Sequence, residues 1–174
     1  TKAALALPNA IAVRSMSKAW GLAGLRVGYA VGRAELIDLL RAVGSPYPTS
    51  GLSLAIAARR LETGQAEMRG YVAQVRAERG ELGELLVECG ASSLPSQGNF
   101  VLARFGDAAC VHEYLLAQGV SVRRFPGRVG MENNLRITVP GNAADFARLC
   151  AAVKDAAKNI SDAFAAPATK EMKR

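Results

Sequence analysis

The sequence predicts an α/β protein whose first part, strands followed by helices, leads into a compact α+β module. Two strand-like segments come early, at 9–15 and 26–32, and helical apolar spacing follows them. A long amphipathic pattern over 67–91 then leads to residues 92–157, where strand and helix periodicities alternate. With 174 residues, half of them apolar, the chain is long enough to bury a core.

These patterns divide the chain into four segments. We expect 1–66 to be the last part of a larger strand-and-helix domain and 67–91 to be a long connecting helix. Residues 92–157 form the predicted α+β module, and 158–174 are a tail or linker. The chain has no initiator Met, and its start is too short and too soon strand-like for a signal peptide. We therefore expect a piece of a longer protein.

The first segment combines two strands with two helices. NAIAVRS (9–15) alternates like a strand, and RVGYAVG (26–32) is typical of a buried, Val-rich strand. Residues 33–44 carry apolar side chains at helical spacing and end at Gly44, as helices often do. LSLAIAARRLETG (52–64) is apolar around almost its whole circumference, so we expect a largely buried helix.

The later segments predict an amphipathic helix over 67–89 and an alternation of short strands and helices after it. Asn142, with Asp145 three residues on, predicts the N-cap of the last helix. The expected strands are 99–105, 120–125 and 135–139, and the expected helix between the first two is 108–118. The end of the chain, 161–174, is rich in Ala and Lys without a clear pattern.

Composition excludes several classes of function. The net charge is +7, but the basic residues are scattered and aromatics make up only 6%, which argues against nucleic-acid binding. The chain contains no run of eighteen apolar residues, so we expect no membrane-spanning helix. The three cysteines lack CxxC spacing, which favours a reducing, cytoplasmic setting over a disulfide framework or a zinc site. A single histidine, His112, excludes a multi-histidine metal site within this chain.

The segment SMSKAWGLAGLRVGYAVG, residues 15–32, carries the most chemistry. Its two serine hydroxyls and Arg26 are groups that bind phosphate oxygens. Lys18 lies among them and is a candidate amine nucleophile for a Schiff base. Gly21 and Gly24 allow a tight turn close to a ligand. Together these groups suit pyridoxal phosphate, which needs an amine for its aldehyde and a cradle for its anion.

Other interpretations of this segment are weaker or plainer. GxxxxGK[ST] is absent, which excludes a phosphate-binding P-loop, and GLAGLRVG lacks GxGxxG spacing and a following helix, which argues against a dinucleotide site. An SxSK motif in a Gly-rich loop between strands also fits an ordinary surface turn.

RSMSKAWGLAGLRVGYAVG closely resembles the lysine segment of the fold-type I, class I/II aminotransferases, which use pyridoxal phosphate. Within that family it is most similar to the histidinol-phosphate aminotransferase branch. The resemblance covers residues 8–153 and includes four further motifs in matching order: SPYPTS (45–50), QGNFVLARF (97–105), GVSVRRFPG (119–127) and NLRITVPG (134–141). It implies the end of the family's large domain followed by its α+β C-terminal domain.

The resemblance also implies roles for the lysine segment. Lys18 would form the Schiff base with the cofactor and then move a proton as general base and acid. Ser15, Ser17 and Arg26 would hold the cofactor phosphate. The family's ring-stacking aromatic, its aspartate at the pyridine nitrogen and its asparagine and tyrosine at the ring hydroxyl all precede the lysine, and no residue here matches them. We therefore expect this C-terminal half to be inactive alone.

Three residues of the C-terminal module are implied to contact the substrate. Arg136 would pair with an α-carboxylate, Arg123 with the phosphate of a phosphorylated substrate, and Asn99 would be a supporting donor near the carboxylate. Alternation along a strand points Arg123 and Arg124 in opposite directions, and the sequence leaves open which of them faces the site.

The implied reaction is transamination between histidinol phosphate and 2-oxoglutarate or glutamate, in histidine biosynthesis. Its partners would be a small phosphorylated amino substrate, a 2-oxo acid and a second copy of the chain in a homodimer. A threonine-phosphate decarboxylase or an aromatic aminotransferase of the same fold is an alternative. So is a pyridoxal-phosphate-binding effector domain of a transcription regulator, or a non-catalytic remnant that packs against a partner.

Overall fold

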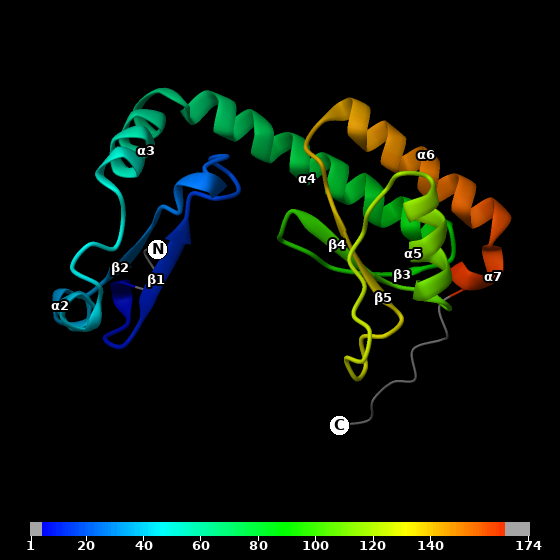
Figure 1. Ribbon diagram of the computed structural model, residues 1–174, viewed down its shortest axis with the longest axis horizontal. Helices are drawn as coiled ribbons and strands as arrows, with labels where there is room; N and C mark the ends of the chain where they lie inside the picture. Colours follow the sequence, from blue (N-terminus) through cyan, green and yellow to red (C-terminus); the bar gives the residue numbers. More distant parts are fainter. Residues whose placement is uncertain (1–4, 166–174) are drawn as a thin grey trace. The chain divides into compact units, whose positions relative to one another are not determined.

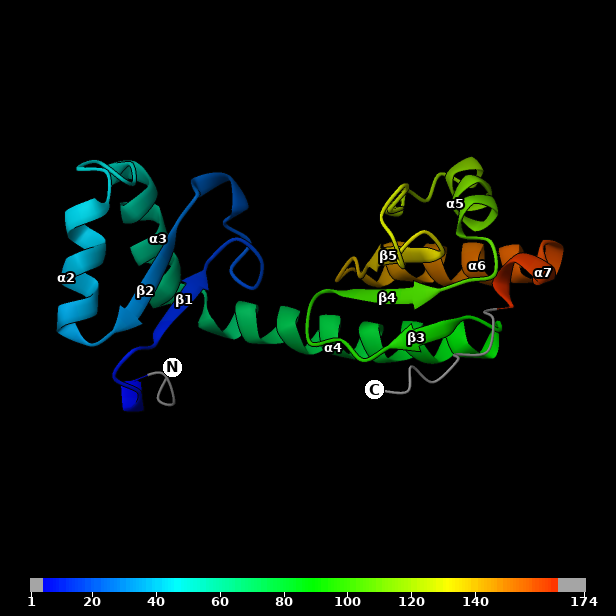
Figure 2. The same cartoon turned by 90° about the horizontal axis from the view of Figure 1, so that it is seen from below.

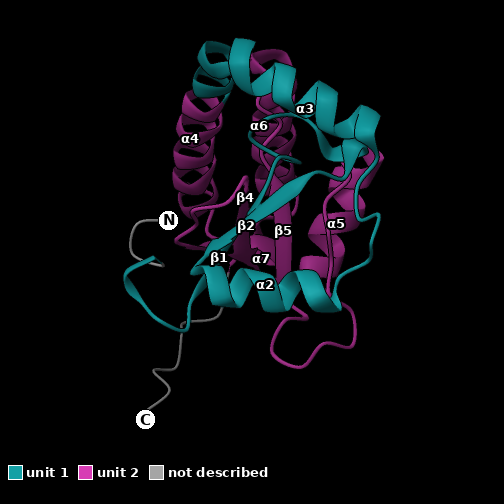
Figure 3. Ribbon diagram, turned by 90° about the vertical axis from the view of Figure 1, so that its left-hand side faces the viewer, with its two compact units in different colours: residues 1–71 teal, residues 72–174 magenta. Residues whose placement is uncertain are grey.

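The computed structural model describes residues 5–165, which fall into two compact units with a boundary between Tyr71 and Val72 (Figure 3). The boundary lies inside a long helix, α4 (Gln65–Glu88). Both units contain strands and helices, as the predicted α/β class requires.

Unit 1 contains a two-stranded antiparallel sheet of β1 (Ile11–Ser15) and β2 (Gly28–Gly32), with Ser15 opposite Gly28 at one end of the ladder. The connection between the strands includes one 3-10 turn, η1 (Ala23–Leu25). Two helices follow, α2 (Ala34–Val43) and α3 (Gly51–Thr63). Each expected strand and helix of this region is present within a few residues of its predicted bounds.

The described part of unit 1 has a small core. Met16, Val27 and Ala57 form its buried cluster, with three partly buried side chains packed against it. The expectation that the helix at 52–64 is largely buried is wrong for these residues, because Ala57 alone is buried in α3 and Leu52 is 72% exposed. An apolar circumference predicts burial only where a second layer covers the helix, and the described residues of unit 1 do not cover this one.

Unit 2 is built on a three-stranded antiparallel sheet in the order β3-β4-β5, with β3 at Ser92–Leu94, β4 at Phe100–Arg104 and β5 at Asn134–Thr138. Its helices besides α4 are α5 (Ala108–Ala117), α6 (Ala143–Asn159) and the short α7 (Ser161–Phe164). Figures 1 and 2 show α4 and α6 running along the same side of the sheet.

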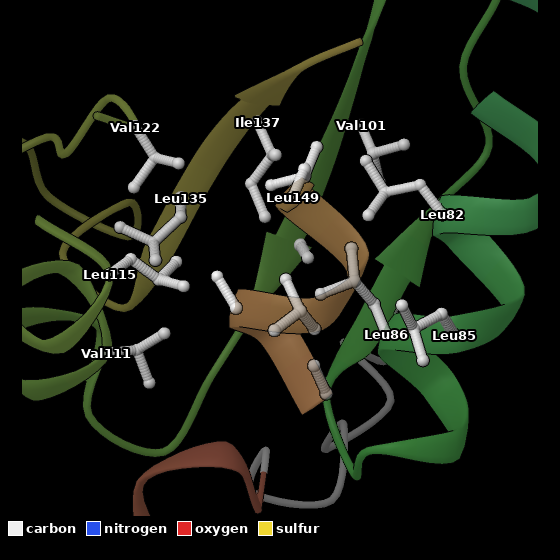
Figure 4. Packing of buried hydrophobic residues seen from close by; sticks show 14 of the residues in the cluster. Leu82, Leu85, Leu86, Val101, Val111, Leu115, Val122, Leu135, Ile137 and Leu149 are labelled. Atoms are coloured by element: carbon white, nitrogen blue, oxygen red, sulfur yellow. The ribbon is translucent and has the colours of Figure 1, made fainter. Parts of the chain in front are cut away.

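Buried and more exposed side chains alternate along β4 and β5, which explains why helices cover one face of the sheet. Val101 and Ala103 from β4 and Leu135 and Ile137 from β5 are buried in one cluster with side chains of α4, α5 and α6 (Figure 4). The intervening positions, including Arg136, therefore lie on the other face of the sheet. That outer face carries the candidate substrate-binding residues.

The start of α6 and the end of α5 are both capped by local hydrogen bonds. Asn142 is the predicted N-cap, and its side chain accepts hydrogen bonds from the backbone N–H groups of Ala144 and Asp145. At the end of α5, Gly119 has φ +73° and the N–H of Val120 donates to the carbonyl of Leu115.

The strand expected over 120–125 is reduced to a single bridge at Arg123. The beginning of that segment closes the preceding helix, and Pro126, which has no N–H, follows it. In contrast, β3 was not expected, because its short sequence SSL shows no alternation.

The core of unit 2 continues beyond residue 157, where the module was expected to end. Phe164 of α7 is 1% exposed, and its ring meets that of Phe105 edge-to-face with centroids 5.3 Å apart. The rest of the expected tail, 166–174, lies outside the described residues. Within residues 5–165, every helix is too short or too polar to cross a bilayer.

Candidate functional site

The lysine segment forms the connection between β1 and β2, and Met16 anchors it. The Met16 side chain is 2% exposed in the core of unit 1. Its backbone N–H donates to the carbonyl of Val27 at 3.1 Å, and its carbonyl accepts from the N–H of Leu22 at 3.1 Å. These contacts fix the backbone on either side of the two serines and the lysine.

Ser15 and Ser17 lie together at the end of β1. The Ser15 hydroxyl donates to the Ser17 hydroxyl oxygen at 2.9 Å, and the N–H of Ser17 donates to the Ser15 hydroxyl oxygen at 3.1 Å. Because Ser15 pairs with Gly28, the two hydroxyls are at the same end of the ladder as the chain entering β2. A pair of hydroxyls and a backbone N–H in this arrangement can bind an anion's oxygens.

Arg26 enters β2 in an unusual backbone conformation. Its φ of 55° and ψ of 36° are left-handed, and it is the one non-glycine residue with positive φ in the described part of the chain. A non-glycine residue in this region costs free energy and is concentrated at functional sites. Its guanidinium makes one hydrogen bond to the carbonyl of Ala23, at 3.3 Å, which leaves other N–H groups available.

Gly28 is required by the close approach of the two strands at this point. A Cβ at position 28 would lie 2.6 Å from the carbonyl oxygen of Arg14, which is closer than real Cβ atoms come. The small residue thus allows the last pair of the ladder, Ser15 with Gly28, to form.

Lys18 lies in the turn between these groups. Its carbonyl accepts a hydrogen bond from the N–H of Gly21, which has the positive φ of 69° that this turn requires. The side chain is exposed, and neither Lys18 nor Arg26 belongs to an ion pair within residues 5–165. Ser15, Ser17, Lys18 and Arg26 therefore lie on one short stretch at and after the end of β1, and within residues 5–165 neither the amine nor the guanidinium is in an ion pair.

The second group of candidate residues lies on the outer face of the unit 2 sheet. Arg123 and Arg136 are directly opposite each other, and each donates its backbone N–H to the other's carbonyl, at 3.1 and 2.9 Å. Residues directly opposite in an antiparallel pair point to the same face. This register places Arg123, and not Arg124, on the side of Arg136.

Each of these arginines has an aromatic ring beside it. The guanidinium carbon of Arg136 lies 5.5 Å from the centroid of Phe100, and that of Arg123 lies 5.9 Å from the centroid of Phe125. The Nε of Arg136 is buried and has no hydrogen-bond partner in the described structure. A buried donor without a partner is costly, so it marks a place where an acceptor would be favourable.

Asn99 immediately precedes Phe100, the first residue of β4. It is half-buried, and its carbonyl accepts from the N–H of Val139 at 2.9 Å, which ties the start of β4 to the end of β5. Sequence reasoning found Asn99, Arg123 and Arg136 but missed Phe100 and Phe125. Their positions beside the arginines follow from cross-strand register, which a single sequence does not display.

The chain is similar in sequence to known aminotransferases over most of its length. A model of the class I and II aminotransferases matches residues 4–153. A histidinol-phosphate aminotransferase from Caldanaerobacter subterraneus is 41% identical over 138 residues, which are 79% of this chain and 39% of the relative. One from Thermoanaerobacter pseudethanolicus is 45% identical over 131 residues, which are 75% of this chain and 37% of the relative.

A solved structure shares both the fold and part of the sequence. Histidinol-phosphate aminotransferase from Sinorhizobium meliloti, in complex with pyridoxal-5'-phosphate, is 28% identical with a TM-score of 0.72. The match covers 87% of this chain and 42% of that one. The chain thus spans about two fifths of the length of the relatives it matches.

Proposed function

The chain belongs to the class I and II aminotransferases, and we propose that it acts as part of a histidinol-phosphate aminotransferase that uses pyridoxal phosphate. The fold-type I resemblance is confirmed at the level of the family and of the fold. The particular substrates follow from the similarity to histidinol-phosphate aminotransferases and from the geometry of the two arginines.

The lysine connection of unit 1 fits the cofactor. Two hydroxyls and the N–H of Ser17 lie at one end of the β1–β2 ladder, Arg26 lies two residues before β2, and donors of these kinds suit a phosphate dianion. When bound, pyridoxal phosphate supplies an aldehyde that combines with amines and a ring that accepts electrons from the substrate's α-carbon. Lys18 is the amine of this segment placed among those donors.

The residues of this chain have three tasks in the proposed reaction. Ser15, Ser17 and Arg26 bind the cofactor phosphate and thereby orient the reactive end toward Lys18. Once its amine is free, Lys18 takes a proton from the substrate's α-carbon and returns it as a general acid. Arg123 and Arg136 bind the anionic groups of the substrates.

The Arg123–Arg136 pair is the observation that carries the substrate assignment. Two arginines on one face, one of them with an unpartnered buried Nε, suit a strongly anionic ligand. We assign Arg123 to the phosphate of histidinol phosphate and Arg136 to the α-carboxylate of glutamate or 2-oxoglutarate, with Asn99 as a supporting donor. The two half-reactions use these anions in turn.

Reduction with borohydride tests the cofactor assignment. In the protein incubated with pyridoxal phosphate, we expect an absorbance band from the covalently bound cofactor that borohydride abolishes, leaving the label on the peptide containing Lys18. K18A should lose both the band and the label, whereas K154A, which removes an exposed lysine from α6, should keep them. A label on another lysine would contradict the assignment.

Arginine variants test the substrate assignment. In the full-length enzyme of which this chain is part, we expect R123Q to raise the KM for histidinol phosphate about 10- to 100-fold, since a charge-assisted hydrogen bond contributes about 1.5–3 kcal/mol. The neighbouring R124Q, on the opposite face, is the matched control and should change KM little. Equal effects of the two variants would refute the assignment that Arg123, and not Arg124, faces the substrate.

The homodimer is also part of the proposal, and light scattering of the protein in solution measures its mass.

A further inference from the structure

We propose that Phe100, packed against Gly98, is a positioning residue that fixes the guanidinium of Arg136 on the outer face of the unit 2 sheet. The inference rests on the proposed function, because it assigns a role within the anion site described above. It concerns the motif QGNF, of which the substrate assignment used only Asn99. We infer that the glycine and the phenylalanine of this motif act together.

The cross-strand register explains why Phe100 and Arg136 meet. Leu102 lies directly opposite Arg136, and Phe100 lies opposite Thr138, so Phe100 is the diagonal neighbour of Arg136 on the same face. Long and aromatic side chains reach such diagonal neighbours. The Arg136 side chain therefore extends toward the Asn99 end of the strand, with its guanidinium carbon 5.5 Å from the ring centroid.

Gly98 makes room for this ring. A Cβ at position 98 would lie 2.9 Å from Cε1 of Phe100 and 3.2 Å from Cδ1. The φ of Gly98 is not in the positive region, so the requirement for glycine here comes from space and not from backbone conformation. Any larger residue would push the ring away from its place beside Arg136.

Helix α4 holds the glycine in position. Nη1 of Arg79 donates to the carbonyl of Gly98 at 2.9 Å, and the N–H of Gly98 donates to the hydroxyl of Ser96 at 3.1 Å. The side chain of Arg79, which stands on a helix of the core, thus holds the backbone of Gly98, against which the ring packs. A guanidinium that rests on a fixed ring has fewer accessible positions than a solvated one.

The consequence concerns the edge of the guanidinium. The ring lies beside the guanidinium carbon, and the N–H groups at the edge of a guanidinium are the ones that bind a carboxylate or phosphate at two points. The unpartnered Nε of Arg136 is one of these edge donors. Phe100 therefore prepares Arg136 for the anion before the anion arrives.

Nuclear magnetic resonance of the 174-residue chain labelled with ¹⁵N-arginine tests this inference. R136Q identifies the Nε–H signal of Arg136 by removing it. In F100L that signal should move toward the signals of exposed arginines such as Arg41, because the ring current and the burial are lost. F100Y, which keeps the ring, should restore it, and G98A should shift it while every direct contact group is retained.

Titration with 2-oxoglutarate supplies the functional readout, since its carboxylate is the group assigned to Arg136. We expect F100L to weaken 2-oxoglutarate binding about three- to tenfold, the range expected from a partly desolvated cation–π contact, and F100Y to bind like the parent. L94A removes a half-exposed leucine from the same face and should leave both the signal and the affinity unchanged. Thermal unfolding identifies any variant that does not fold, in which case G98A and F100Y carry the test.

The two readouts separate the possible failures. An unchanged Arg136 signal in both F100L and G98A overturns the inference, whatever the 2-oxoglutarate affinity. A shifted signal without 2-oxoglutarate binding in the parent supports the positioning role and contradicts the anion site of the proposed function. Weakened binding in F100L that F100Y does not restore overturns the inference, because shape and not the aromatic face would then be responsible.

Discussion

The two units use their apolar residues in opposite ways. In unit 2 the apolar positions of β4, β5, α5 and α6 converge on one large buried cluster. In unit 1 the buried cluster contains only Met16, Val27 and Ala57 among the described residues, while Leu52 and Val43 are 72% and 84% exposed. Similar helical patterns in the sequence therefore end in very different environments.

The difference shows where each candidate site obtains its rigidity. Arg136 stands on a strand whose other face is fully packed, so its backbone is fixed by the burial of Leu135 and Ile137. Lys18 lies on a connection held mainly by Met16 and by backbone hydrogen bonds. We expect the anion site of unit 2 to be the more rigid of the two within this chain.

Large-to-small substitutions test this comparison most strongly. F105A removes a fully buried ring that packs on Phe164, and we expect it to lower the free energy of unfolding by about 3–5 kcal/mol. L52A on α3 should change it by less than about 0.5 kcal/mol, since the side chain is exposed. Urea unfolding followed by circular dichroism measures both. A large loss in L52A would mean that α3 is covered in solution.

A pair of glycines, one in each unit, gives the next largest effect. A Cβ at Gly28 would lie 2.6 Å from the carbonyl oxygen of Arg14, and one at Gly106 would lie 2.7 Å from that of Ala165. We expect G28A and G106A each to destabilise by about 1–3 kcal/mol, because backbone has to move.

Hydrogen exchange distinguishes the two glycine variants. G28A should increase amide exchange in β1 and β2 alone, whereas G106A should increase it throughout the better-packed unit 2. Exchange that rises equally across both units in either variant would show that they unfold as one cooperative body, and would remove the contrast between them.

Substitutions at helix N-caps should give smaller changes in stability that also differ between the two units. The side chains of Asp107 and Asn142 each accept two backbone N–H hydrogen bonds at the starts of α5 and α6. D107A and N142A should each cost about 1 kcal/mol. Ser50 precedes α3 without a side-chain cap bond, so S50A should be nearly neutral. Chemical denaturation of the three variants checks this, and a comparable loss in S50A would contradict it.

The smallest expected effect is the pH dependence of the Arg60–Glu67 ion pair. Nη1 of Arg60 lies 2.7 Å from a carboxylate oxygen of Glu67, and this hydrogen bond lowers the pKa of Glu67. Because the folded pKa is lowered, the pair stabilises above the unfolded pKa of about 4.3, and the contribution is lost as pH falls through the folded value.

The control for this pair is E67Q. Its thermal midpoint should fall slightly below that of the parent at pH 7 and coincide with it at low pH, since the Glu67 carboxylate is exposed and the pair is screened by solvent. A difference that persists or grows at low pH would show that the carboxylate acts in some other way.

Helices and strands with a strong periodic pattern were predictable from the sequence. Features that depend on which other elements pack or pair with a segment were not. Alternation in LRITV identified β5 and placed Arg136 on the face opposite Leu135, and Asn142 identified the start of α6. The strand expected over 120–125 is a single bridge, because the closure of α5 takes up its beginning. The burial expected for the helix at 52–64 was wrong, because a helix is buried only where another element packs against it.

By itself, the sequence determined the family, the α/β class and the identity of the candidate residues, because these depend on residue types at fixed spacings along the chain. Only the tertiary structure decided that Arg123, and not Arg124, shares a face with Arg136, and that Phe100 is beside its guanidinium. Both facts follow from the hydrogen-bond register between strands distant in sequence. A shift of one residue in that register would have exchanged the faces without altering a letter of the sequence.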